Sequence, residues 1–97
     1  MSATDNAILL VQIVRVPAEG IADFQRYESL VLPLLPTYGG RMERRLRSAD
    51  GAIEVHVLSF PSADALDRYR TDPERQAQLP LLERSGAKTE LIEVDDA

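Results

Sequence analysis

Apolar residues run almost without interruption through Ala7–Val16 (AILLVQIVRV), near the start of the chain. β-Branched residues are frequent in this segment, which favours a strand. One face would carry Leu9, Val11 and Ile13, and the other Ile8, Leu10 and Val14, with Gln12 as the polar interruption. A strand with one wet face alternates apolar and polar residues. This pattern therefore predicts a strand that is covered on both faces.

A helical periodicity follows the turn at Pro17–Gly20. Apolar and aromatic residues recur three or four positions apart, at Ile21, Phe24, Tyr27, Val31, Leu34 and Tyr38, which is the spacing of one helix face. Pro33 and Pro36 lie within this pattern, and each removes a backbone donor. We therefore expect the regular helix to end near Leu32, a tight turn to reach Tyr38, and Gly39-Gly40 to stop the segment.

Two further strands, Arg41–Ser48 and Ala52–Phe60, flank Asp50-Gly51. This dipeptide predicts a two-residue hairpin turn of type I′, and the turn fixes the register. Arg45 then faces His56 and Arg47 faces Glu54 on one side, while Leu46 faces Val55 and Arg44 faces Val57 on the other. We expect the first set to lie on the sheet face away from the helices.

The last third of the chain carries helix signals and a final strand. Ser62 is a good N-cap for a short helix that would bury Ala63, Leu66 and Tyr69. Asp72-Pro73 predicts a second helix start, with proline in the favoured first position. Pro80 should break or kink this helix, Ser85-Gly86 should end it, and Ala87–Val94 (AKTELIEV) predicts a fourth strand.

The predicted order is β-α-β-β-α-β, which is typical of the α+β ferredoxin-like class: a four-stranded antiparallel sheet with both helices on one face. The two apolar faces of the first strand favour pairing of that sheet with a second copy of the chain. We therefore predict a single domain over residues 7–94, flexible tails at residues 1–6 and 95–97, and a homodimer in which the two sheets form a dimeric α+β barrel.

Composition narrows the function classes. The net charge of −5 disfavours nucleic acid as a partner, because phosphate binding needs a basic face. The absence of cysteine excludes disulfides and thiolate chemistry. No signal peptide and no apolar run long enough to cross a bilayer is seen, so we expect a cytoplasmic protein without a membrane partner.

Three motifs carry a family resemblance: Tyr38-Gly39-Gly40-Arg41, Phe60-Pro61-Ser62 and Asp72–Gln76 (DPERQ). Together they resemble a family of small bacterial proteins of unknown function within the dimeric α+β-barrel superfamily. That superfamily also holds antibiotic-biosynthesis monooxygenases, EthD-like proteins and muconolactone isomerases. The resemblance spans about Leu9 to Val94 and implies a homodimeric barrel, but no particular activity.

His56 is the only histidine of the chain and the strongest candidate for chemistry, since its ordinary pKa lies near neutrality. In the predicted register, Glu54, Arg45 and Gln12 are its neighbours. This set would suit a general base with an anion clamp, acting on an enolisable or phenolic substrate. The alternative is a set of cross-strand polar pairs within a wet dimer interface, and this second interpretation has more weight.

The other candidates concern metals and pockets. One histidine and no cysteine make a zinc or copper site a poor fit, and haem held by a mid-strand His56 fits little better, so we predict no metal and no cofactor. Tyr27 and Tyr38 would line a pocket between helix and sheet, where the resemblance implies that relatives hold ligands, or would simply be core. The arginines at 41, 44, 45 and 47 indicate an acidic ligand or, more plainly, a solvated hairpin.

Two functions stay open at this point. One is a small dimeric barrel protein that binds a small molecule or has a structural role. The other is a cofactor-independent monooxygenase, isomerase or lyase that acts on a small aromatic or enolisable substrate with His56 as base. Few aromatic residues are available to shape a substrate pocket, so the first is preferred.

Overall fold

The computed structural model describes residues 6–97. The strands are β1 (Ile8–Arg15), β2 (Arg41–Arg47), β3 (Ile53–Phe60) and β4 (Lys88–Val94), and the α-helices are α1 (Ile21–Val31), α2 (Ala63–Arg70), α3 (Pro73–Ala77) and α4 (Leu79–Ser85). Two 3₁₀ segments, η2 (Ala18–Gly20) and η3 (Leu32–Tyr38), flank α1. The tail expected at residues 1–6 lies, except for Asn6, outside the described residues.

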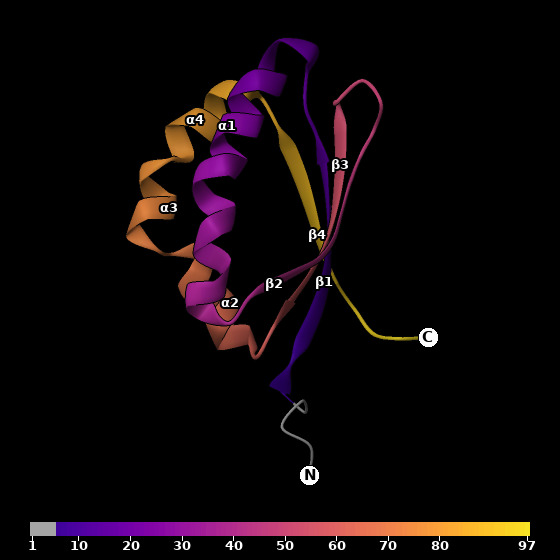
Figure 1. The fold of residues 1–97 in the computed structure, drawn as a ribbon, viewed down its shortest axis with the longest axis vertical. Helices are drawn as coiled ribbons and strands as arrows, with labels where there is room; N and C mark the ends of the chain where they lie inside the picture. The colour runs from indigo at the N-terminus through magenta and orange to yellow at the C-terminus, as the bar shows by residue number, and fades with distance from the viewer. Residues whose placement is uncertain (1–5) are drawn as a thin grey trace.

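The four strands form one antiparallel sheet in the order β2-β3-β1-β4. The helices all lie against one face of this sheet, and no helix of the described chain covers the opposite face (Figure 1). This arrangement confirms the predicted ferredoxin-like class. No helix within residues 6–97 is both long enough and apolar enough to span a bilayer.

The predicted helix ends are confirmed. The helix after β1 gives way to the 3₁₀ segment η3 at Leu32, and Gly39 ends η3 with a left-handed φ of 72°, a conformation that glycine adopts without a Cβ clash. The Ser62 hydroxyl accepts from the backbone N–H of Ala65, and the Asp72 carboxylate caps α3. The break before α4 falls at Gln78, because Pro80 is tolerated in the first turn of the new helix.

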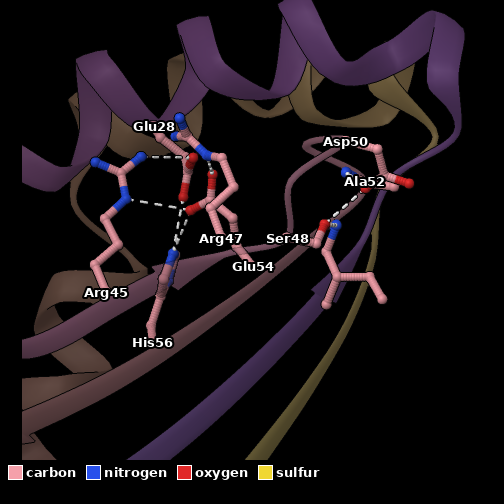
Figure 2. A network of polar contacts seen from close by, with 9 residues as sticks. Glu28, Arg45, Arg47, Ser48, Asp50, Ala52, Glu54 and His56 are labelled. Carbon is pink, nitrogen blue, oxygen red and sulfur yellow. Dashed lines mark hydrogen bonds and ion pairs between the residues drawn. The ribbon is translucent and has the colours of Figure 1, made fainter.

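The hairpin between β2 and β3 has the predicted register but not the predicted turn. Arg45 pairs with His56 and Arg47 with Glu54. Within the loop between β2 and β3, positive φ is confined to Gly51, so Asp50 does not have the conformation that a type I′ turn requires. The Asp50 carboxylate instead accepts from the Ala52 backbone and the Ser48 hydroxyl (Figure 2). This local bonding supports a wider loop that leaves the strand pairing unchanged.

The face assigned to Glu54 and His56 is wrong. Both side chains are buried on the face that the helices cover. Leu58 and Phe60 continue this face of β3 and belong to the core under the helices, so the polar pair has to point the same way. In α2, similarly, Ala65 and Tyr69 are buried, whereas Ala63 is exposed and Leu66 only partly buried.

The opposite face of the sheet, which we call the outer face, is largely apolar. Strand alternation and register place the following residues there: Leu9, Val11, Ile13, Leu46, Ile53, Val55, Val57, Ile92 and Val94. All are half-buried or exposed, and Leu46, Ile53 and Ile92 are among the most exposed large apolar residues of the described chain. β1 is thus apolar on both faces, as its sequence pattern predicted.

Candidate functional site

A cluster of charged residues lies between α1 and the β2–β3 hairpin. We call Glu28, Arg45, Arg47, Glu54 and His56 the polar cluster. Glu28 reaches down from α1, and the other four side chains point up from two paired strands toward it (Figure 2). Glu28, Glu54 and His56 are each no more than 2% exposed. Charges removed from water to this extent have to be paired with one another.

Every carboxylate of the polar cluster is paired with a cation. Arg45 donates from Nη2 to Glu28 Oε1 over 2.8 Å and from Nε to Glu54 Oε1 over 3.2 Å. Arg47 donates from Nε to Glu54 Oε2 over 2.7 Å. The ring Nε2 of His56 lies 2.8 Å from Glu54 Oε1 and 3.0 Å from Glu28 Oε2. Two carboxylates are therefore balanced by two guanidinium groups and one imidazole.

The surroundings of His56 favour its charged form. Its Nδ1 lies 3.3 Å from Gln12 Oε1, while Nε2 faces the two carboxylates. Both ring nitrogens therefore face acceptors, and only the imidazolium donates from both. Burial alone would lower the pKa of His56, but the hydrogen bonds and charges of Glu28 and Glu54 outweigh burial and raise it above its ordinary value.

The same contacts hold Glu54 ionised. Burial opposes the charge of this carboxylate, yet its contacts with His56, Glu28, Arg47 and Arg45 prevail and lower its pKa to about 2. In Arg45, likewise, the nearby carboxylates outweigh burial and raise the pKa of the guanidinium. The contacts within the polar cluster thus favour the charged forms of His56, Glu54 and Arg45.

Glu28, Glu54 and His56 also offer three ligand atoms within 4.8 Å of one another, which is a spacing that a metal ion can use. A metal would require neutral His56 and would place a dication beside two guanidinium groups that already bond both carboxylates. Coulomb repulsion at such separations opposes binding. The arrangement therefore fits an internal ion network better than a metal site.

A cavity of about 250 Å³ lies beside the polar cluster, between the sheet and the helices. We call it the helix–sheet cavity. Its apolar walls are formed by Val14, Phe24, Val31, Leu32, Leu58, Leu66, Leu79, Leu82 and Leu91. Its polar lining consists of Gln12, Tyr27, Glu28, Arg70, Arg75 and Thr89. A mostly apolar cavity with a few polar groups is the usual composition of a small-molecule site.

Three buried side-chain atoms find no hydrogen-bond partner among residues 6–97: Tyr27 Oη, Glu28 Oε2 and Arg75 Nε. All three residues line the helix–sheet cavity. Glu28 Oε2 nevertheless lies 3.0 Å from His56 Nε2, which is its ion-pair partner, so Tyr27 Oη and Arg75 Nε are the two atoms left without any partner in the described part of the chain. Buried polar groups are nearly always satisfied, so their gathering around one cavity indicates that something polar binds there.

The sequence-predicted site residues separate into three groups. Gln12 and Tyr27 line the helix–sheet cavity. His56, Glu54 and Arg45 come together as predicted, but they lie behind Glu28 rather than in the cavity lining. Tyr38 lies apart from both, where its hydroxyl donates to Asp72 and its ring packs edge-on against Tyr69, with 6.2 Å between ring centres.

Sequence reasoning missed Glu28, Arg70 and Arg75. A signal for Glu28 was present, because it lies four residues after Phe24 and three before Val31 on the buried stripe of α1. Nothing comparable marks the two arginines. Arg75 follows the Asp72 cap in a short polar helix, and its approach to the cavity depends on the packing of α3 against α1.

No family model and no curated protein matches the sequence. Solved structures do match. A candidate antibiotic biosynthesis monooxygenase from Caulobacter crescentus is 14% identical, with a TM-score of 0.73 over 96% of this chain and 93% of that one. SnoaB, a cofactor-independent oxygenase from Streptomyces nogalater, is 20% identical, with a TM-score of 0.66 over 95% and 94% of the two chains.

A candidate antibiotic biosynthesis monooxygenase from Nitrosomonas europaea gives a TM-score of 0.77 at 9% identity, over 94% of this chain and 90% of that one. Identities this low carry information about the fold alone. The resemblance inferred from the sequence motifs is confirmed at that level: the chain has the ferredoxin-like α+β fold of the antibiotic-biosynthesis-monooxygenase-like proteins.

Proposed function

We propose that the protein is a homodimeric small-molecule-binding protein that holds its ligand in the helix–sheet cavity. One observation carries this proposal: two buried polar atoms without a partner among the described residues, Tyr27 Oη and Arg75 Nε, belong to residues that line this one cavity. Leaving each of them unsatisfied costs about 1–3 kcal/mol. A ligand that pairs with them recovers this free energy as affinity.

The dimer proposal is based on the outer face. Its apolar residues span all four strands, and a continuous apolar surface of this kind marks an interaction site. Packing two such faces across a two-fold axis would cover both and complete a second layer over each sheet. The partner of the outer face is therefore proposed to be a second copy of this chain.

In this proposal the polar cluster positions Glu28 rather than performing chemistry. Arg45 bonds Glu28 Oε1 at 2.8 Å, and His56 holds the other oxygen at 3.0 Å. Both contacts come from behind the cavity wall, so they fix the carboxylate that faces the ligand. His56, Glu54 and Arg45 thus support the site from outside, while Gln12 and Tyr27 belong to its lining. Tyr38 has no part in it.

An enzyme with His56 as general base is not favoured. A base must accept a proton from the substrate at hydrogen-bond distance, whereas His56 lies outside the cavity lining and is surrounded by acceptors. The oxygenase activity of SnoaB is a property of that protein, and at 20% identity it is not assigned to this chain. The cytoplasmic location expected from the sequence stays a prediction.

Ligand binding is tested by titrating the isotope-labelled protein with a mixture of single-ring organic compounds and following amide NMR shifts. We expect shifts to concentrate at cavity residues. Leu79→Trp, which fills the cavity wall, should abolish them. Leu30→Trp is the matched control, because Leu30 is an exposed residue of α1 outside the lining. Shifts that persist in Leu79→Trp, or no shifts at all, would refute the cavity as a binding site.

The dimer is tested separately by light scattering coupled to size exclusion at tens of micromolar protein. The expected mass is twice the 10.8 kDa of one chain. Val57→Asp places a charge within the outer face and should weaken the dimer at least roughly a hundredfold, because an unpaired buried charge costs several kcal/mol. Leu30→Asp, on the helix side, should leave the mass unchanged. A monomeric wild-type protein would contradict the dimer while leaving the cavity proposal intact.

A further inference from the structure

We infer that the ligand of the helix–sheet cavity is a small organic carboxylate with an apolar body about one ring in size, held by Arg75 and Tyr27. This inference rests on the proposed function and adds the chemical class of the ligand to it. Arg75 is the charge partner, Tyr27 the second donor, and the leucine-rich walls receive the apolar body.

The charge balance of the cavity favours an anion. The charged residues of its lining are Glu28, Arg70 and Arg75. Glu28 is neutralised from behind by Arg45 and His56. Neither Arg70 nor Arg75 forms an ion pair with any residue between 6 and 97. The protein as a whole carries a charge of −5, yet two cations without an ion-pair partner in the described chain, Arg70 and Arg75, line this cavity.

The guanidinium of Arg75 is oriented for a carboxylate. It stacks over the Tyr69 ring, 4.8 Å from the ring centre, which fixes its plane. Nη1 points toward the Arg70 carbonyl oxygen at 3.4 Å. Nε is buried without an acceptor among residues 6–97, and the edge that it forms with Nη2 donates no hydrogen bond within that range. Two parallel N–H groups on one edge match the two oxygens of a carboxylate.

Tyr27 supplies the second donor. Its side chain is 4% exposed, and its hydroxyl has no partner among the described residues. Burial raises its pKa, Arg75 opposes this, and Glu28 adds to it. The phenol therefore keeps its proton at neutral pH and can donate it to a ligand oxygen. The influence of Arg75 on this hydroxyl also indicates that both donors serve the same part of the cavity.

The size of the cavity limits the apolar body. Pockets for drug-sized ligands occupy about 300–1,000 Å³, and the helix–sheet cavity, at about 250 Å³, lies just below that range. Phe24 and the leucines of the walls offer only apolar contacts to whatever lies beyond the carboxylate. One ring, or a branched chain of similar volume, fits these limits.

The test compares benzoate with benzamide, which has the same ring but no charge, by calorimetric or NMR titration of the wild-type protein at pH 7. We expect benzoate to bind at least roughly tenfold more tightly, because a hydrogen bond to a charged group contributes more than a neutral one. This comparison needs no variant and so does not depend on any variant folding.

Two variants test whether Arg75 and Tyr27 cause the preference for benzoate over benzamide. Arg75→Gln should weaken benzoate roughly tenfold or more and leave benzamide nearly unchanged, whereas Tyr27→Phe should weaken both a few-fold. Arg68→Gln is the matched control, because Arg68 lies on α2 with a 64% exposed side chain and pairs with Asp64. It should bind benzoate like the wild type.

The outcomes separate the two proposals. Equal binding of benzoate and benzamide, abolished by Leu79→Trp, would overturn the carboxylate inference and leave small-molecule binding standing. Unchanged benzoate affinity in Arg75→Gln would also overturn the inference. Failure of both compounds to bind at millimolar concentration, together with no binder in the single-ring mixture, would overturn both.

Discussion

The polar cluster and the helix–sheet cavity lie side by side under α1. They differ in whether their buried polar groups have hydrogen-bond partners. In the polar cluster, the single carboxylate of Glu54 has three partners, which are two arginines and a histidine. Around the cavity, Tyr27 and Arg75 each leave a buried atom without a partner among the described residues. Glu28 belongs to both regions. A satisfied network indicates a structural role, and unsatisfied groups around a cavity indicate a binding role.

The largest expected effect is in the polar cluster. Glu54→Gln should lower the free energy of unfolding by about 3 kcal/mol, because removing one partner leaves buried charges uncompensated. The side chains of Arg45 and Arg47 are 39% and 41% exposed, so water offsets part of the loss and the low end of the usual range applies. Urea denaturation measures this.

The matched control for this substitution is Glu43→Gln on the neighbouring strand. Glu43 pairs with Arg41 at 3.9 Å near the surface, and such exposed pairs contribute little. We expect a change within about 0.5 kcal/mol. If Glu54→Gln proved as mild as Glu43→Gln, the polar cluster would lose its structural role, and the contrast with the cavity would disappear.

A smaller effect concerns pH. The pKa of His56 is raised on folding, so its stabilising contribution is complete below the unfolded pKa of about 6.5 and is lost as pH rises through the folded value. The loss is at most about 1.4 kcal/mol per pH unit for one proton. The pKa of Glu54 is lowered, so its contribution is lost in the opposite direction, as pH falls below about 4.5 toward 2.

Unfolding midpoints measured across pH 5–9 test this prediction. The slope above pH 6.5 should be present in the wild type and reduced in His56→Gln. Because the chain has one histidine, NMR titration of its imidazole gives the folded pKa directly. A value at or below 6.5 would show that His56 is not held as an imidazolium between the two carboxylates.

The smallest expected effect on stability lies in the cavity wall. Tyr27→Phe removes a hydroxyl that has no partner within residues 6–97, so it should lower the free energy of unfolding of the ligand-free protein by no more than about 0.5 kcal/mol. Arg75→Gln also removes the stacking over Tyr69 and the contact of Nη1 with the Arg70 carbonyl oxygen, so its loss should stay below about 1 kcal/mol. Removing an unsatisfied donor can even stabilise a protein. Losses above about 2 kcal/mol in the same denaturation assay would mean that these side chains are structural after all.

Much of the fold could be predicted from the sequence because its signals are local. Proline placement, the Ser62 and Asp72 caps and the helix-ending glycines each act within a few residues, and all of them held. The β2–β3 register also held, even though the turn is of another type. A two-residue turn and the observed wider loop bring the same residues opposite each other.

The candidate site was predicted less well because it depends on tertiary contacts. The face of Glu54 and His56 was misassigned because Val55 and Val57, the two valines that flank His56, looked like the core side of β3. Those valines instead lie on the outer face, and Glu28 from α1 makes burial of the polar pair possible. Arg75 enters the site only through the packing of α3, which no short-range pattern in the sequence indicates.

The most direct test of the central claim is a crystal structure of the protein grown with saturating benzoate. The claim is that the unsatisfied groups around the helix–sheet cavity form a ligand site. It predicts an organic molecule in the cavity, with its carboxylate at hydrogen-bond distance from Arg75 Nε and Tyr27 Oη. Water molecules alone bonded to these atoms, or a cavity filled by rearranged side chains, would contradict it.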